Sequence, residues 1–114
     1  MSEFEIHRVE RLLAGLVERK RPPPHLRPQL DLAWRREGHR FEVFEVRARW
    51  QGAPGETIEN PVARTTWVKS RRLWRLYWMR ADGKWHRYDP LPEARTLEAV
   101  LEEIEADRFG CFWG

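Results

Sequence analysis

Two carboxylates and an arginine form the clearest catalytic pattern in this chain. Many metal-dependent nucleases place an Asp on one strand and Glu-x-Lys on the next, so that two carboxylates hold Mg²⁺ while the cation positions a phosphate. Here Asp31 is followed by Glu45-Val46-Arg47. Asp31, Glu45 and Arg47 are therefore candidate catalytic residues of a nuclease-like enzyme. Arg takes the place of Lys, however, and an ion pair at the edge of a sheet is the simpler interpretation.

The turn between the two strands decides whether these side chains meet. A two-residue turn over Glu37-Gly38 would point Asp31 away from Glu45, because successive side chains of a strand alternate between its faces. A three-residue turn that includes His39 would place Asp31 directly opposite Glu45. Both registers gather comparable sets of apolar side chains, so the sequence leaves both open.

A second group of residues favours binding rather than catalysis. Residues 71–88 contain three Trp, two Tyr and five Arg, and Asp82-Gly83 within them is a strong hairpin signal. A two-residue loop there gathers aromatic and cationic side chains on one sheet face, and the predicted binding residues are Arg64, Arg75, Tyr77, His86 and Tyr88. Single-stranded nucleic acids bind such faces by base stacking and by Arg or Lys contacts with phosphates. A half-solvated sheet surface and a homodimer interface are the alternatives.

The opposite face of the same strands is more apolar and is predicted to be the core. With the two-residue loop, its members are Trp67, Trp74, Leu76, Trp78 and Trp85. Large aromatic side chains fill a thin two-layer core well. We therefore expect the helices of the chain to cover this face.

Apolar periodicity and turn residues predict the elements that position these side chains. Ser2 and Glu5 form a capping box before a helical stripe that ends ahead of Pro22, and Thr96 can cap a second helix. Between them we expect five strands, near residues 30–35, 41–50, 62–69, 73–81 and 84–88, with loops at 51–61 and 89–95. The prediction is an α+β fold in one domain, 1–114: a five-stranded antiparallel sheet with the N-terminal and C-terminal helices packed on one face.

Charge and composition limit the kinds of partner and the cellular location that we expect for the chain. The net charge is +3, but residues 19–87 carry seventeen Lys and Arg against seven Asp and Glu, between two acidic ends. Such a middle segment favours an acidic polymer as partner, unless the acidic ends fold over it. Cys111 is the only cysteine and the N-terminal residues are charged, so we expect a cytoplasmic protein without membrane association. The four histidines are scattered, and we predict no metal site and no cofactor.

Several segments in order resemble one family of small bacterial proteins, catalogued as domain of unknown function three-thousand-twenty-four. These segments are R-P-P-P-H-L-R-P-Q-L-D-L (21–32), F-E-V-R-A-R-W (44–50), P-V-A-R-T-T-W-V-K (61–69), W-R-L-Y-W-M-R-A-D-G-K-W-H-R-Y-D-P (74–90) and F-G-C-F-W-G (109–114). The resemblance covers nearly the whole chain. It implies a bacterial, single-domain protein and brings no activity, cofactor or catalytic residue. The leading functional prediction is a non-enzymatic binding or assembly domain, with a nuclease-like enzyme and a homodimeric structural protein as alternatives.

Overall fold

The N-terminal helix forms where its capping box and apolar stripe predict it. In the computed structural model, which describes residues 1–114, α1 spans Glu3–Lys20. The Ser2 hydroxyl accepts a hydrogen bond of 3.2 Å from the Glu5 backbone N–H and caps the helix. A 3₁₀ turn, η1 (Pro24–Leu26), follows the helix. The buried residues of α1 lie on the predicted stripe and are Val9, Leu13, Leu16 and Val17.

The second helix, α2 (Leu97–Ala106), also begins at its predicted cap. The Thr96 hydroxyl accepts a bond of 3.2 Å from the Ala99 backbone N–H. At the other end the Asp107 carboxylate accepts bonds from the backbone N–H groups of Phe112 and Trp113, at 3.0 and 2.9 Å. These bonds fold the tail back against the body. Neither helix combines the length and apolar character that crossing a membrane would take.

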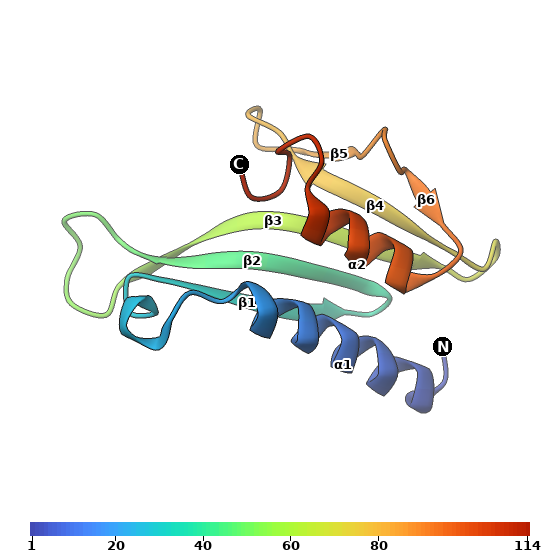
Figure 1. Ribbon diagram of the computed structural model, residues 1–114, viewed down its shortest axis with the longest axis horizontal. Coiled ribbons are helices and arrows are strands. Elements are labelled where there is room, and N and C mark those ends of the chain that lie inside the picture. The colour runs from blue at the N-terminus through green and yellow to red at the C-terminus, as the bar shows by residue number, and fades with distance from the viewer.

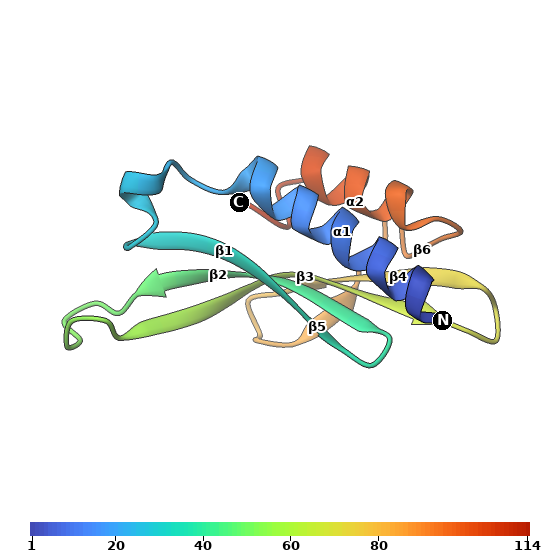
Figure 2. The same cartoon turned by 90° about the horizontal axis from the view of Figure 1, so that it is seen from below.

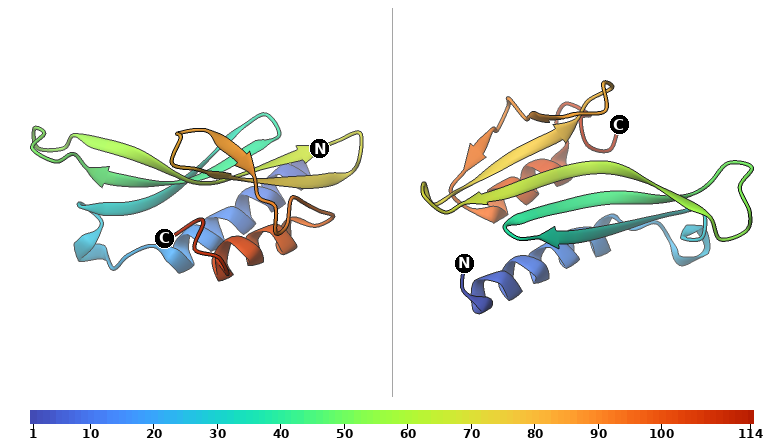
Figure 3. Two further views of the ribbon diagram at one scale, coloured as in Figure 1. Left: turned by 90° about the horizontal axis from the view of Figure 1, so that it is seen from above. Right: turned by 180° about the vertical axis from the view of Figure 1, so that it is seen from behind.

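The strands form one antiparallel sheet, with both helices on the same side of it (Figures 1, 2 and 3). Five strands follow each other in chain order across the sheet, and a sixth short strand pairs with the fourth beside the fifth. The predicted fold class is therefore confirmed, with one strand added. The strands are β1 (Leu30–Glu37), β2 (Arg40–Ala48), β3 (Thr57–Val68), β4 (Leu73–Met79), β5 (Trp85–Arg87) and β6 (Glu93–Ala94).

Two segments predicted to be loops contain strand residues. β3 begins at Thr57, within the segment predicted to be a loop, because its first half pairs with the second half of β2. Pro61 pairs with Phe44 beside an irregularity of the ladder, and a bulge is one of the few places where a strand accepts proline. β6 likewise lies in a predicted loop, where Ala94 pairs with Trp74.

The core lies between the helices and one face of the sheet. Trp74 is buried, and its ring lies 5.2 Å from that of Trp67 and 5.8 Å from that of Phe41, measured between centroids. Trp67 and Trp78 pack against this cluster as predicted. Trp50, at the projecting β2–β3 end, is 86% exposed and takes no part in the core.

Candidate functional site

The β4–β5 hairpin has a different turn from the predicted one. Arg80 and Lys84 face each other across a three-residue loop, and the Arg80 backbone N–H donates to the Lys84 carbonyl at 3.2 Å. Within the loop, the Gly83 N–H donates to the Arg80 carbonyl at 2.9 Å, and Gly83 has a φ of 77°. This is a tight turn closed by a left-handed glycine, the commonest three-residue hairpin. It shifts the ladder by one residue relative to the predicted two-residue loop.

The shift exchanges the faces of every residue after the turn. Trp85 pairs with Met79 and therefore lies on the sheet face away from the helices. His86 pairs with Trp78, and the Tyr88 N–H donates to the Leu76 carbonyl, so both point to the other face. The predicted placement of His86 and Tyr88 in the binding face is therefore wrong, and so is the placement of Trp85 in the core.

Tyr88 is a fully buried core residue. Its ring lies 4.8 Å from that of Phe112, between centroids. Its hydroxyl donates a bond of 2.9 Å to the Glu103 carboxylate. Burial, and then this bond to a carboxylate, raise the pKa of Tyr88. The side chain thus joins the sheet to α2 and is not available to a ligand.

His86 holds the hairpin together. Its Nε2 atom lies 2.8 Å from the Asp82 carboxylate, which also accepts a bond of 2.9 Å from the Lys84 backbone N–H. The backbone bond and then His86 lower the pKa of Asp82. The pair orders the turn that places Trp85.

The face away from the helices gathers three of the five predicted binding residues. Arg64 pairs with Tyr77 across β3 and β4, and Arg75 lies two residues before Tyr77 on the same face. Trp85 completes the group: the Arg64 guanidinium lies over its ring, 4.6 Å from the centroid. We call Arg64, Arg75, Tyr77 and Trp85 the sheet platform. Sequence reasoning missed Trp85 because Asp82-Gly83-Lys84 fits a three-residue loop as well as a two-residue one.

Most of the positive charge near the platform is paired. Glu42, whose side chain is only 15% exposed, lies 2.7 Å from Arg64, 3.5 Å from Arg35 and 3.7 Å from Arg40. Arg75 differs, since it makes no ion pair; its buried Nε, like that of Arg40, has no hydrogen-bond partner. An unsatisfied buried donor on the same face as Tyr77, two residues away, is a candidate contact for a ligand.

A shallow hollow of about 660 Å³ lies over part of the platform. Its size is within the range of small-molecule sites, about 300–1,000 Å³. Aromatic rings and guanidinium groups line it, which suits a planar, anionic ligand. The lining residues are Glu37, Gly38, His39, Arg40, Arg64, Thr66, Tyr77 and Trp85.

The structure separates Asp31 from the other two candidate nuclease residues, Glu45 and Arg47. The β1–β2 turn follows neither predicted register, and Asp31 pairs with Val46, so it points to the face opposite to that of Glu45. The Asp31 carboxylate instead accepts two bonds of 2.8 Å from Arg21, which lower the pKa of Asp31. Glu45 pairs with Arg47 at 3.1 Å. No group of three or more His, Cys, Asp and Glu side chains is placed to hold a metal ion.

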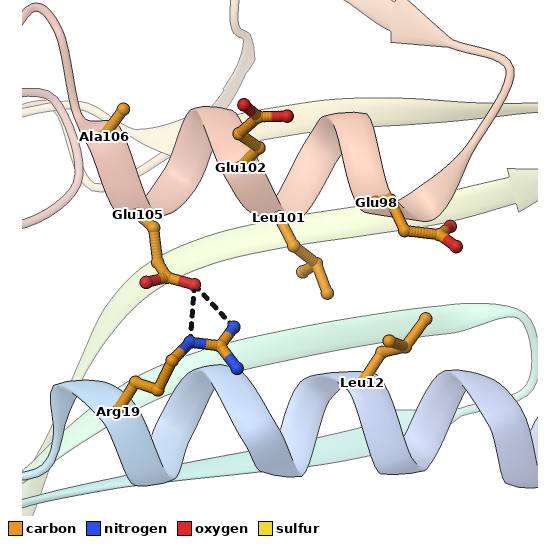
Figure 4. Close-up of a pocket in the computed structure, with 7 residues that line it drawn as sticks. All are labelled: Leu12, Arg19, Glu98, Leu101, Glu102, Glu105 and Ala106. Atoms are coloured by element: carbon orange, nitrogen blue, oxygen red, sulfur yellow. Dashed lines mark hydrogen bonds and ion pairs between the residues drawn. The ribbon is translucent and has the colours of Figure 1, made fainter.

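A groove between the two helices is the other notable hollow (Figure 4). Leu12 and Leu101 point towards each other across it, and Glu105 accepts a bond of 2.9 Å from Arg19 at one end. Glu102 points away from α1. Such apolar contacts between flanking ion pairs are typical of helix packing, and they supply neither a free base nor a nucleophile.

Comparison with known proteins gives one match. Residues 1–114, the whole chain, match the family described as Domain of unknown function (DUF3024). No curated protein and no solved structure matches the chain. This chain, with its two helices over one face of an antiparallel sheet and its aromatic platform on the other, belongs to the family Domain of unknown function (DUF3024).

Proposed function

We propose that this chain is a non-enzymatic binding domain whose sheet platform binds single-stranded nucleic acid. One observation carries the proposal: the side chains of Arg64, Tyr77 and Trp85 lie together, and Arg75, on the same face, forms no ion pair although Glu93 lies opposite it on β6. Bases stack on exposed aromatic rings whatever their identity, at about 1–3 kcal/mol per base. Arg75 supplies a partner for a phosphate.

The paired arginines shape the expected affinity. Arg64 already bonds Glu42, so a phosphate gains less from Arg64 than it would from a free cation. Stacking on Tyr77 and Trp85 then contributes a large share of the binding energy. Double-stranded nucleic acid hides its bases within the helix and cannot use these rings. The proposal therefore requires a preference for single strands.

Self-association is the second candidate function, favoured by the apolar margin of the same face. Val68 and Leu73 pair with each other on this face, and Met79 lies beside Trp85; all are only half-buried. An uncovered apolar sheet face is a common homodimer interface. Sedimentation velocity across a range of concentrations separates the two functions, since a stable dimer would cover the platform.

The test is fluorescence anisotropy of labelled single- and double-stranded oligonucleotides, titrated with the protein at two salt concentrations. We expect binding that is tighter for single strands and that weakens as salt rises. Absence of binding at low salt would overturn the nucleic-acid proposal. Equal affinity for both forms would show that charge, not the platform, governs the binding.

We also propose that the protein works in the bacterial cytoplasm. Its single cysteine, Cys111, rules out an intrachain disulfide and suits a reducing compartment. Fractionation of cells that express the chain with an epitope tag tests this location.

A further inference from the structure

We propose a second ligand site, separate from the sheet platform, that binds a nucleoside phosphate. It lies at the end of the molecule where the start of α1 meets the β3–β4 loop (Figures 1 and 2). Two adjoining hollows, of about 260 and 440 Å³, share Met1, Glu5 and Trp67 in their walls. We call these hollows together the end pocket.

Three cations without acidic partners line the end pocket. Lys69 and Arg72 line one hollow and Arg95 lines the other. All three are exposed and none takes part in an ion pair, whereas the neighbouring Arg8 pairs with Glu98. Glu5 is the one carboxylate that both hollows share, so positive charge prevails. Converging Lys and Arg side chains are suited to a phosphate dianion.

The backbone at Arg72 strengthens the assignment. Arg72 has a φ of 52°, in the left-handed region that favours glycine. Few residues other than Gly, Asn and Asp occupy this region, and strained residues cluster at ligand sites. This position holds a long cationic side chain although glycine would suit the turn better. Binding of a phosphate by the Arg72 guanidinium would explain this choice of residue.

Trp67 identifies the rest of the ligand. Its ring packs on that of Trp74 in a tilted arrangement, and the side chain lines both hollows together with the three cations. A flat aromatic group can stack there while its phosphate reaches Lys69 or Arg72. The Glu5 carboxylate, on the same wall, can accept a bond from the exocyclic amine of a base. Phosphate, flat ring and amine together describe a nucleotide with an amino base.

The end pocket and the sheet platform are independent. Trp67 pairs with Trp74 on the helix-covered face of the sheet, whereas Arg64 and Tyr77 lie on the opposite face. Each site can therefore be removed without touching the other. A result that overturns one proposal therefore does not overturn the other.

The experiment is isothermal titration of the full chain with adenosine 5′-monophosphate, adenosine and inorganic phosphate. We expect the nucleotide to bind most tightly, phosphate more weakly, and adenosine, which lacks the phosphate, most weakly of all. Arg72→Gly is the informative variant, because glycine relaxes the backbone while it removes the cation. We expect it to melt no lower than the parent and to lose about tenfold in nucleotide affinity.

Matched variants make the result decisive. Arg11→Gln removes another exposed, unpaired cation from the outer side of α1 and should leave nucleotide affinity unchanged. Trp85→Ala should also leave nucleotide affinity unchanged. Lower nucleotide affinity in Trp85→Ala would show that the nucleotide binds the sheet platform, and would overturn the end pocket. Absence of nucleotide binding at millimolar concentration, or full affinity in Arg72→Gly, would overturn it as well.

Two sources of the ligand remain to be distinguished by the same titration. The comparison uses Trp85→Ala, whose sheet platform is disabled. In this variant, a 5′-phosphorylated oligonucleotide that binds as tightly as the mononucleotide, while its 5′-hydroxyl counterpart binds weakly, identifies the end of a strand. Rejection of both oligonucleotides by Trp85→Ala, with the mononucleotide still bound, identifies a free nucleotide. Either result agrees with the end pocket.

Discussion

The guanidinium group of Arg64 lies over the ring of Trp85, 4.6 Å from its centroid, and its Nε donates a bond of 2.9 Å to the Glu42 carboxylate. Arg64 is thus held from two sides, by a ring on β5 and by a carboxylate on β2. A guanidinium group fixed in this way loses little freedom when a ligand binds beside it. The relationship turns three strands into one ordered surface.

Arg75 is expected to set the salt dependence of oligonucleotide binding. Arg75 forms no ion pair, although Glu93 lies opposite it on β6, so a phosphate that contacts Arg75 releases a counterion. Arg75→Gln should weaken binding and reduce the slope of log K against log salt by about 0.7 for a single strand. Anisotropy titrations at four salt concentrations measure the slope. An unchanged slope, equal to that of the control Arg11→Gln, would place the phosphates elsewhere.

Glu42 is expected to oppose binding, because its carboxylate competes with phosphates for Arg64 and its neighbours. Glu42→Gln keeps the size of the side chain and removes the charge. We expect a several-fold gain in oligonucleotide affinity, because one more ion pair with phosphate at the protein surface contributes about that much. A loss of affinity in the same titration would show that Glu42 is needed to orient Arg64.

Tyr88 is expected to matter for stability and not for binding. Tyr88→Phe removes the bond from its hydroxyl to Glu103, and Glu103 keeps its second donor, Arg108. The free energy of unfolding should fall by about 1 kcal/mol. The Tyr77 hydroxyl makes no hydrogen bond within the protein, so Tyr77→Phe should change the free energy of unfolding by less than about 0.5 kcal/mol. Urea denaturation checks both, and weaker oligonucleotide binding by Tyr88→Phe would contradict its place in the core.

The helices and the sheet order were predictable because their signals are local. Ser2, Thr96 and Pro22 mark helix ends through interactions within a few residues. Apolar periodicity predicts the helical residues between those ends. The face of each residue after a hairpin depends instead on one added loop residue. Asp82-Gly83-Lys84 allows two loop lengths that differ little in energy, and packing of Tyr88 under α2 accompanies the longer one.

The binding residues were predictable to the same extent as the register. Arg64, Arg75 and Tyr77 lie on strands whose pairing was predicted correctly, so the structure brings them together. Trp85 and Tyr88 lie beyond the shifted turn and exchange places. The ion pair of Asp31 with Arg21 joins residues on different elements, and no periodicity of the sequence reveals it.

The Asp31–Arg21 pair predicts a pH dependence of stability. Bonds from Arg21 lower the pKa of Asp31 in the folded chain, below the value of about 3.9 expected when it is unfolded. The contribution is therefore complete above the unfolded pKa and is lost as pH falls through the folded pKa. Asp31→Asn should be less stable than the parent at pH 7, and the difference should shrink below about pH 4.

Urea denaturation at pH 7 and at pH 3 measures this difference. Asp89→Asn, at an exposed aspartate without an ion pair, serves as the control and should match the parent at both values. A stability loss in Asp31→Asn that is the same at pH 7 and pH 3 would show that hydrogen bonding, not charge, stabilises this contact.

The most direct test of the sheet platform compares two tryptophans. Trp85 lies under the Arg64 guanidinium on the platform, whereas Trp50 is 86% exposed at the projecting β2–β3 end. Anisotropy titration of one labelled single-stranded oligonucleotide, with variants confirmed as folded by circular dichroism, measures both. We predict that Trp85→Ala loses about tenfold or more in affinity and that Trp50→Ala stays within about twofold of the parent. Parent-like affinity in Trp85→Ala, or an equal loss in Trp50→Ala, would contradict binding on the sheet platform.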